Sequence, residues 1–425
     1  MSQISVVSGS QSPAGETTAF GERIVRLADR LATRSESPDG LTCTFLSPAH
    51  IAVAKDIAAL MAAGGLDVKM DAAANVVGRY RSQSPQAKTV IVGSHYDTVR
   101  DGGKYDGRLG ILVALAIAEH LAQNEIRLPY NLEVIAFSEE EGVRYSTSYI
   151  GSSAVAGRFD PTLLDRRDAN DITLADALQM AGHDPSAIPA LARRREDLAG
   201  YLEVHIEQGP VLLAENLPVG VVTDIAGNSR FLITVEGAAG HAGTVPMALR
   251  HDAVAASAEI TLMVERHCVQ AGILGTVGRL FVPNGAINLI PGRCELSLDI
   301  RSSDDAVRKA AVRDILSNIT HIAERRRVTA TFAQVLDAAA VPCSVRLQEA
   351  FANSITRAGC AVRRLPSGAG HDAVMFSGLT DIGMLFVRCG NGGVSHSPRE
   401  IVDAHDVDFA ARILLDVLLN FNHSK

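Results

Sequence analysis

Residues 90–97 read VIVGSHYD, a short apolar run that ends in glycine and serine and is followed at once by a histidine and an aspartate. Three further runs have the same character, at residues 132–137 (LEVIAF), 201–204 (YLEV) and 384–387 (MLFV). Such runs, bounded by polar residues or glycine, are typical of strands buried on both faces of a largely parallel sheet. The apolar residues 109–123 lie between the first two runs and predict a crossover helix. The pattern therefore predicts an α/β layered fold.

The length of the chain favours two domains, because 425 residues exceed what one hydrophobic core usually supports. Between about residues 218 and 339 the pattern changes to strands at 231–236, 274–280, 294–300 and 328–332 and helices at 253–267 and 305–326. Since a further buried strand and polar motifs follow, this segment is interpreted as an inserted α+β domain. We expect a polar, flexible tail at 1–17, a discontinuous catalytic domain at 18–217 and 340–425, and an inserted lid at 218–339.

The composition excludes several classes of partner. The net charge of -8 is spread along the chain, which gives no sign of a nucleic-acid partner. The most apolar stretch, residues 110–118, meets Glu119 and His120 long before it could span a bilayer, so no membrane association is expected. Six scattered cysteines without a C-x-x-C pair, and no secretory signal, favour a reducing cytosol over a disulfide framework.

Metal-capable side chains follow each of the four buried runs. His95 and Asp97 follow the first, a run of three glutamates at 139–141 follows the second, His205 the third and His396 the fourth. In open α/β sheets ligands bind beyond the carboxyl ends of the strands, so these groups are expected to converge. A single histidine of this kind is more often an ordinary hydrogen-bonded residue. The whole set would be a costly concentration of buried charge unless cations neutralised it.

The number of candidate ligands suits two ions. A pair of ions needs a bridging carboxylate and further ligands for each ion, and five residues meet that need: His95, Asp106, Glu141, His205 and His396. Imidazole and carboxylate ligands without cysteine fit zinc, manganese, cobalt or nickel. Asp97, two residues after His95, is better placed to hold the other N–H of that imidazole than to bind metal.

Eight motifs together carry a resemblance to a known family. In sequence order, from about residue 20 to the C-terminus, the chain is similar to the hydantoinase/carbamoylase branch of the M20 metallopeptidase-like amidohydrolases. The motifs are GSHYDTV (93–99), GGKYDG (102–107), EEEGVRY (139–145), HIEQGP (205–210), GHAGTVPM (240–247), NLIPG (288–292), GHDA (370–373) and SHSPRE (395–400).

The resemblance implies a role for each metal-site residue. Asp106 would bridge two divalent ions, with His95 and His396 on opposite sides and Glu141 and His205 completing the ligands. Glu140 would be the general base, and a carboxylate beside two cations is suited to that role. The run of three glutamates leaves Glu139 as the second choice.

The resemblance also implies a lid that carries a homodimer interface. His241 would reach the active site of the partner subunit and stabilise the developing oxyanion, although a histidine among glycines could merely cap a turn. Asn288 and Arg301 would hold the substrate, since the planar guanidinium suits a carboxylate. Gln208 and His371 would contact its amide or ureido end.

The implied reaction is hydrolysis of a linear amide or ureido C–N bond in a small carboxylate substrate, with release of ammonia and CO2. Residues 36–50 (ESPDGLTCTFLSPAH) and 98–107 (TVRDGGKYDG) resemble allantoate amidohydrolases most. N-carbamoyl-L-amino acids and N-carbamoyl-β-alanine remain alternative substrates.

Other enzyme classes and a non-catalytic role compete with this interpretation. A dipeptidase or deacylase of the wider M20 family would share the metal site. A non-catalytic small-molecule-binding α/β protein is the alternative from another class. Residues 237–243 (GAAGHAG) have the wrong spacing for a dinucleotide loop, and no GxxxxGK[ST], H-E-x-x-H or G-x-S-x-G motif occurs.

Overall fold

The structure is a computed structural model that describes residues 20–421, so the expected tail at 1–17 lies outside the described residues. These residues form two compact units. The first contains residues 20–220, 349–363 and 384–421, and the second contains residues 221–348 and 364–383. Within residues 20–421, no helix combines the length and apolarity that a bilayer crossing requires.

The first unit is built on a mixed sheet. Its strands lie in the order β1 (Asp67–Met70), β2 (Val76–Tyr80), β4 (Asn131–Phe137), β3 (Thr89–His95), β5 (Leu198–Ile206) and β15 (Ile382–Val387). β3 runs parallel to both β4 and β5, and β3, β4 and β15 are buried at every residue. The four predicted buried strands are therefore confirmed.

The prediction of a largely parallel sheet is wrong at one edge. β1 pairs antiparallel with β2, and β2 pairs antiparallel with β4. The segment 71–75 between β1 and β2 is too short for a crossover, so the two strands can only form a hairpin. β1 carries no apolar run and is mostly exposed, which left it without a sequence signal.

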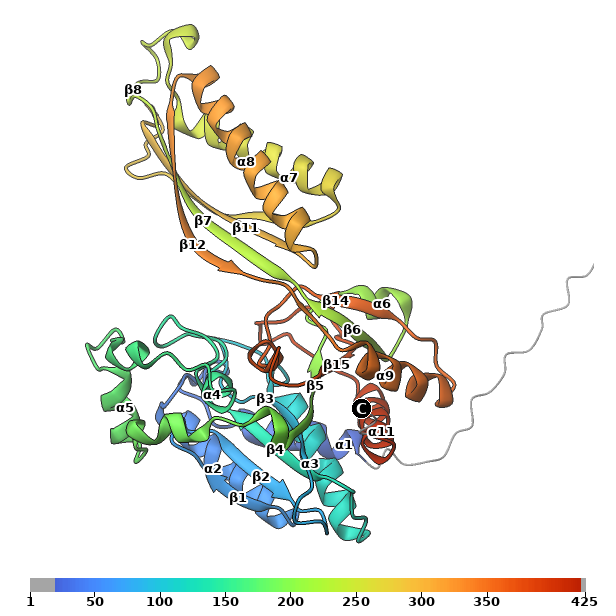
Figure 1. Ribbon diagram of the computed structural model, residues 1–425. Helices are drawn as coiled ribbons and strands as arrows, with labels where there is room; N and C mark the ends of the chain where they lie inside the picture. Colours follow the sequence, from blue (N-terminus) through green and yellow to red (C-terminus); the bar gives the residue numbers. More distant parts are fainter. Residues whose placement is uncertain (1–19, 422–425) are drawn as a thin grey trace, which may run out of the picture. The chain divides into compact units, whose positions relative to one another are not determined.

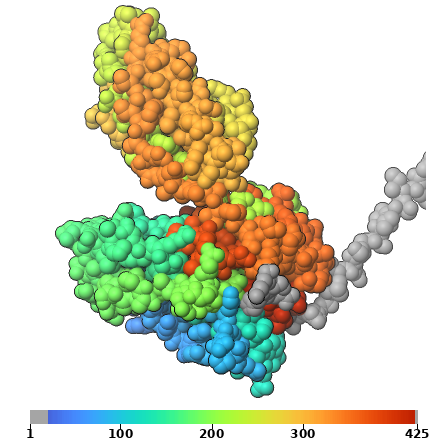
Figure 2. All heavy atoms as spheres, viewed as in Figure 1, coloured from blue at the N-terminus to red at the C-terminus, as the bar shows by residue number. Residues whose placement is uncertain are grey.

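Helices from both ends of the described chain pack in the first unit. The predicted crossover helix is α3 (Arg108–Gln123), which is buried over most of its length. The Asp408 carboxylate of α11 (Ala404–Leu419) accepts hydrogen bonds from the backbone N–H groups of Phe20 and Gly21 at the start of α1 (Gly21–Ala32). In Figure 2, a small patch of dark red C-terminal residues lies next to blue and teal residues of the first unit. The remaining helices of the unit are α2 (Pro48–Ala63), α4 (Ile150–Val155), α5 (Leu174–Met180), α6 (Val211–Glu215) and α9 (Val345–Arg357), with 3-10 turns at Pro161–Asp165, Pro185–Leu191 and Arg195–Asp197.

The second unit contains a four-stranded antiparallel sheet in the order β12 (Thr329–Ala338), β7 (Gly227–Glu236), β11 (Arg293–Ser302) and β9 (Leu274–Phe281). Helices α7 (Ala253–Ala271) and α8 (Asp305–Arg326) cover one face of it (Figure 1). Burial alternates along β7, with Phe231, Ile233 and Val235 in the core beneath the helices, as expected for a sheet that is covered on one face. The predicted α+β pattern of this segment is confirmed.

Two short strands join the second unit from later in the chain. β13 (Val341–Pro342) pairs antiparallel, and β14 (Arg364–Ser367) parallel, with β6 (Val219–Ile225). The unit also holds α10 (Ala373–Phe376) and a two-stranded ribbon of β8 (Gly240–His241) and β10 (Leu289–Ile290). Residues 341–348 and 364–383 thus belong to the second unit, whereas the sequence suggests that the first domain resumes at residue 340. The assignment of catalytic and lid roles to the two parts stays a prediction.

His50 on α2 predicts a loss of stability in mild acid. Its ring is buried, stacks on Tyr96 at 4.3 Å and bonds through Nε2 to the Ser138 carbonyl at 2.6 Å. Burial lowers the pKa of His50 from 6.5 to about 4. Between pH 6.5 and about pH 4 this histidine binds a proton in the unfolded chain but not in the folded chain, so the free energy of unfolding falls as the pH falls. From pH 6.5 to pH 5 the expected loss is about 1.5 kcal/mol.

The measurement is urea unfolding of the wild type and of His50→Gln, whose amide can still donate to Ser138, at both pH values. The variant is expected to lose about 1.5 kcal/mol less than the wild type over this interval. An equal loss in the two proteins would show that His50 does not titrate in this way.

Candidate active site

The five predicted metal ligands lie together in the first unit, around Asp106. One oxygen of its carboxylate, Oδ1, is 3.2 Å from His205 Nε2 and 3.6 Å from His95 Nε2. The other oxygen, Oδ2, is 3.2 Å from His396 Nε2, which is also 3.4 Å from Glu141 Oε1. The ends of β3, β4 and β5 and the loop after β15 therefore bring these side chains to one place.

The cluster divides into two sets that share Asp106. One set is His95, Asp106 and His205, and the other is Asp106, Glu141 and His396; in each, one ligand atom per residue lies within 4.8 Å of the others. Two sets with one shared carboxylate are the arrangement that a pair of divalent ions requires. The residues present therefore fit two ions.

The imidazoles are oriented for ligation. His205 Nδ1 is 2.9 Å from the Ile206 carbonyl, and its Nε2 accepts a hydrogen bond from Gly107 N–H. When the ring is neutral, its proton is therefore on Nδ1, which leaves the lone pair of Nε2 for a metal ion. Gly107 has φ 65° and no room for a side chain, because a Cβ there would lie 2.5 Å from the His95 ring.

Asp97 contacts one metal-ligand candidate and the backbone of two glutamates at the site. Its Oδ1 is 3.3 Å from His95 Nδ1, and its predicted role of holding that imidazole stays a prediction. Its two oxygens also accept hydrogen bonds from the backbone N–H groups of Glu140 (3.1 Å) and Glu141 (3.2 Å). This fully buried carboxylate therefore orients a ligand of β3 and the glutamates after β4 together.

The three consecutive glutamates differ in their access to solvent. The Glu139 side chain is fully buried, and its burial, together with the nearby Asp97, raises its pKa well above the ordinary value. Glu140 is 9% exposed. Burial, and then Asp106, raise the pKa of Glu141 to about 7. Only an accessible carboxylate can exchange protons with a substrate, so this difference favours Glu140 over Glu139 as the base.

The charges of the cluster are strongly coupled. Burial alone would raise the pKa of Asp106, but hydrogen bonds from His205, His396 and His95 hold it well below the ordinary value. The same bond raises the pKa of His396 to about 9. Protonated imidazoles therefore supply positive charge beside the Asp106 carboxylate. A bound cation would supply this charge in place of the protons.

Three more side chains lie around Asp106, two of them at its Oδ2 oxygen. Gln208 Nε2 donates to Asp106 Oδ2 at 2.9 Å, so this predicted substrate contact does lie at the site. Ser395 Oγ lies 3.1 Å from the same oxygen, and Glu400 accepts hydrogen bonds from the backbone beside it. Ser395 and Glu400 are not among the predicted site residues, although both belong to the motif SHSPRE. His396 itself has φ 53°, a conformation that non-glycine residues usually keep only where the surroundings enforce it.

The other four predicted residues, His241, Asn288, Arg301 and His371, belong to the second unit. His241 on β8 faces Leu289 of β10, and Ala242 N–H donates to the Asn288 carbonyl at 2.9 Å. Arg301 makes two hydrogen bonds of 2.9 Å to Asp299 and donates to the Gly368 carbonyl. His371, in the loop that follows, is buried with Nε2 2.7 Å from Ser367 Oγ. Their predicted roles toward substrate stay predictions.

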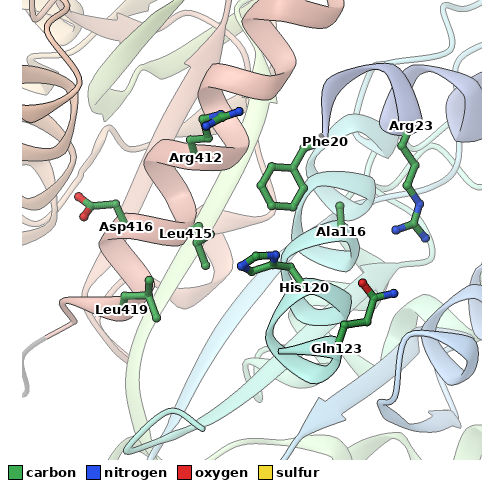
Figure 3. Close-up of a pocket in the computed structure, with 9 residues that line it drawn as sticks. All are labelled: Phe20, Arg23, Ala116, His120, Gln123, Arg412, Leu415, Asp416 and Leu419. Atoms are coloured by element: carbon green, nitrogen blue, oxygen red, sulfur yellow. The ribbon is translucent and has the colours of Figure 1, made fainter. Parts of the chain in front are cut away.

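A separate pocket lies between α1, α3 and α11 (Figure 3). It has a volume of about 450 Å³, and its cations are paired, Arg23 with Glu119 and Arg412 with Asp408. None of the residues around Asp106 lines it. The chemistry therefore lies elsewhere.

Comparison with known proteins identifies the class of this chain. The chain belongs to peptidase family M20/M25/M40, whose sequence pattern matches residues 91–420. It is 39% identical to the N-carbamoyl-L-amino acid amidohydrolase of Geobacillus stearothermophilus, over 93% of this chain and 97% of that protein. It is also 39% identical to a probable allantoate deiminase of Oryza sativa subsp. japonica, over 93% of this chain and 87% of that protein.

A solved structure has the same fold over nearly the whole chain. The hydantoinase/carbamoylase family amidase of Burkholderia multivorans matches with a TM-score of 0.88 and 30% identity, covering 94% of this chain and 97% of that one. The predicted family and the two-domain α/β architecture are thereby confirmed. The chain is an amidohydrolase of the M20 family, as its relatives are.

Proposed function

We propose that this chain hydrolyses a linear ureido C–N bond of a small carboxylate substrate, with allantoate as the first choice and N-carbamoyl-L-amino acids as the second. The observation that carries the proposal is the convergence of three imidazoles on the two oxygens of Asp106, with Glu141 beside the imidazole of His396. The products are the amine, ammonia and CO2.

The chemistry divides between a water molecule and the protein groups around it. Two divalent ions, zinc or manganese with cobalt or nickel as alternatives, would be held by His95, Asp106, Glu141, His205 and His396, and would make water more acidic and polarise the scissile carbonyl. Glu140 accepts a proton from the attacking water and delivers it to the leaving nitrogen as the C–N bond breaks. Asp97 keeps Glu140 in place through its backbone N–H.

His241 of the second unit is suited to donate a hydrogen bond to the developing oxyanion. Its Nδ1 accepts a hydrogen bond from Gly243 N–H at 3.1 Å, so the ring proton is on Nε2. The side chain is exposed, which leaves this N–H free to approach a substrate. In this proposal Arg301 and Asn288 hold the substrate carboxylate, while Gln208 and His371 contact the ureido end.

We also propose a homodimer formed through the second unit. β9 and β12 are the edge strands of its sheet and carry exposed apolar side chains, among them Phe281 (49% exposed) and Val335 (55%). Exposed edge strands of this kind pair readily with another chain. Sedimentation of a monomer at all concentrations would exclude the dimer.

A cytoplasmic location is proposed because all six cysteines are free thiols, as is usual in a reducing compartment. Recovery of the native protein in an oxidising secreted fraction would contradict it.

The choice of substrate rests on similarity alone. Relatives named for allantoate and for N-carbamoyl-L-amino acids are equally identical to this chain. Residues 36–50 and 98–107 resemble the allantoate enzymes, and the solved structure of AtUAH in complex with glyoxylate, a small carboxylate, has a TM-score of 0.79 and 30% identity.

Ammonia release is the test of the proposed function. The full chain, supplied in turn with Zn²⁺, Mn²⁺, Co²⁺ or Ni²⁺, is assayed on allantoate, N-carbamoyl-L-amino acids, N-carbamoyl-β-alanine and, by amine release, dipeptides. Turnover of allantoate at least about tenfold above the others, in kcat/KM, is expected. Preference for dipeptides would contradict the ureido assignment, and no turnover with any metal would favour a non-catalytic binding protein.

A further inference from the structure

We infer that Glu400 is a positioning residue that fixes Asp106 against His396, and that Ser395 completes this link. The inference rests on the proposed metal site. It concerns the side chains that hold the ligands in place and adds no ligand.

Glu400 joins two loops that are far apart in sequence. Its side chain is 2% exposed, and Oε1 accepts hydrogen bonds from Tyr105 N–H (2.8 Å) and Asp106 N–H (3.1 Å). Glu400 itself lies four residues after His396, on the loop that follows β15. The Glu400 carboxylate thus links the backbone of Asp106, the shared ligand, to the loop that carries the ligand His396.

The same carboxylate also reaches the side chain of Asp106. Ser395 Oγ lies 3.1 Å from Glu400 Oε2 and 3.1 Å from Asp106 Oδ2, and it accepts a hydrogen bond from Gln208 Nε2 at 3.2 Å. A hydroxyl has one hydrogen, so Ser395 donates to one carboxylate at a time. Residues Ser395 and Glu400 therefore contact both the backbone N–H and the Oδ2 oxygen of Asp106.

The loop before Asp106 is shaped around this carboxylate. A Cβ at Gly103 would lie 2.2 Å from Glu400 Cδ and Oε1. Only a residue without a side chain allows this close approach, so residues 103–106 pack directly on Glu400. The contact leaves Asp106 little freedom to move relative to His396.

Removal of a side chain that holds a metal ligand by hydrogen bonds commonly lowers metal affinity about 10–100-fold. Glu400→Ala leaves two buried N–H groups without an acceptor and releases Ser395. Glu400→Gln keeps one oxygen for Tyr105 and Asp106, and its amide nitrogen can donate to Ser395, which then donates to Asp106. The two variants therefore separate hydrogen bonding from negative charge.

The test is titration of the metal-free full chain with Co²⁺. Calorimetry measures the affinity during the titration, and the visible absorption spectrum reports on the bound ion. Glu400→Ala is expected to bind Co²⁺ about 10–100-fold more weakly and with an altered spectrum. Glu400→Gln is expected to stay within about threefold of the wild type, and Ser395→Ala to fall between the two. Glu196→Ala, an exposed glutamate far from these contacts in the sequence, is the control.

Wild-type affinity and spectrum in Glu400→Ala would overturn the inference. An equal loss in Glu400→Gln and Glu400→Ala would also overturn it, because charge and not position would then matter. Should Glu400→Ala fail to fold, wild-type affinity in Ser395→Ala overturns the link to the side chain of Asp106, and a loss there supports it. Failure of the wild type to bind Co²⁺ would instead refute the proposed function.

Discussion

Glu140→Gln is expected to lower kcat by about 10³-fold while the metal content stays at the wild-type value. The amide cannot accept the proton that the attacking water gives up, and general bases commonly contribute about 10²–10⁴-fold. The backbone N–H of residue 140 still donates to Asp97, so the neighbouring ligand Glu141 keeps its place. Ammonia release and metal analysis of the same sample measure both quantities.

Glu139→Gln is the matched control, since it makes the same change one residue earlier. The Glu139 side chain is fully buried, so it cannot reach a substrate, and this variant is expected to retain most of its kcat. Equal activity of Glu140→Gln and wild type, with loss in Glu139→Gln, would move the base to Glu139. Full activity in both variants would discard the mechanism.

Asp106→Ala is expected to abolish detectable turnover and to lower the metal content by at least one ion per chain. This carboxylate belongs both to the set His95, Asp106 and His205 and to the set Asp106, Glu141 and His396. Its removal leaves each set one ligand short and takes the shared acceptor from three imidazoles. Metal analysis after dialysis against a chelator, together with the ammonia assay, provides the measurement.

Asp171→Asn serves as the control for Asp106→Ala, because the Asp171 side chain is 84% exposed and pairs with Arg167 four residues earlier. It should keep both metal and activity. Full metal occupancy in Asp106→Ala would contradict a bridging role for this residue. Retained turnover would contradict the whole site.

The sequence predicted the centre of the first unit well, for a physical reason. Strands buried on both faces appear as continuous apolar runs, and the polar residues after such runs must meet where the strands end. His95, Glu141, His205 and His396 could therefore be predicted from the sequence to lie at one site. The antiparallel edge formed by β1 and β2 gave no such signal, because β1 is short and exposed.

The parts that could not be predicted depend on contacts between distant segments. β13 and β14 are too short for a periodic pattern, and only their pairing with β6 places them in the second unit. The role of Glu400 depends on backbone N–H groups 294 and 295 residues away, and no side-chain pattern records such bonds. The sequence indicated that Asp97 holds His95. It did not indicate that Asp97 also accepts hydrogen bonds from the backbone of Glu140 and Glu141.

The discontinuity of the first unit has a consequence for biosynthesis. His396 and Glu400 lie on the loop after β15, so the ribosome makes them only after the entire second unit. A nascent chain can fold β3, β4 and β5 early and still leave Asp106 without its later neighbours. Translation that stops inside the second unit would therefore yield a protein with most of the sheet and no working catalyst.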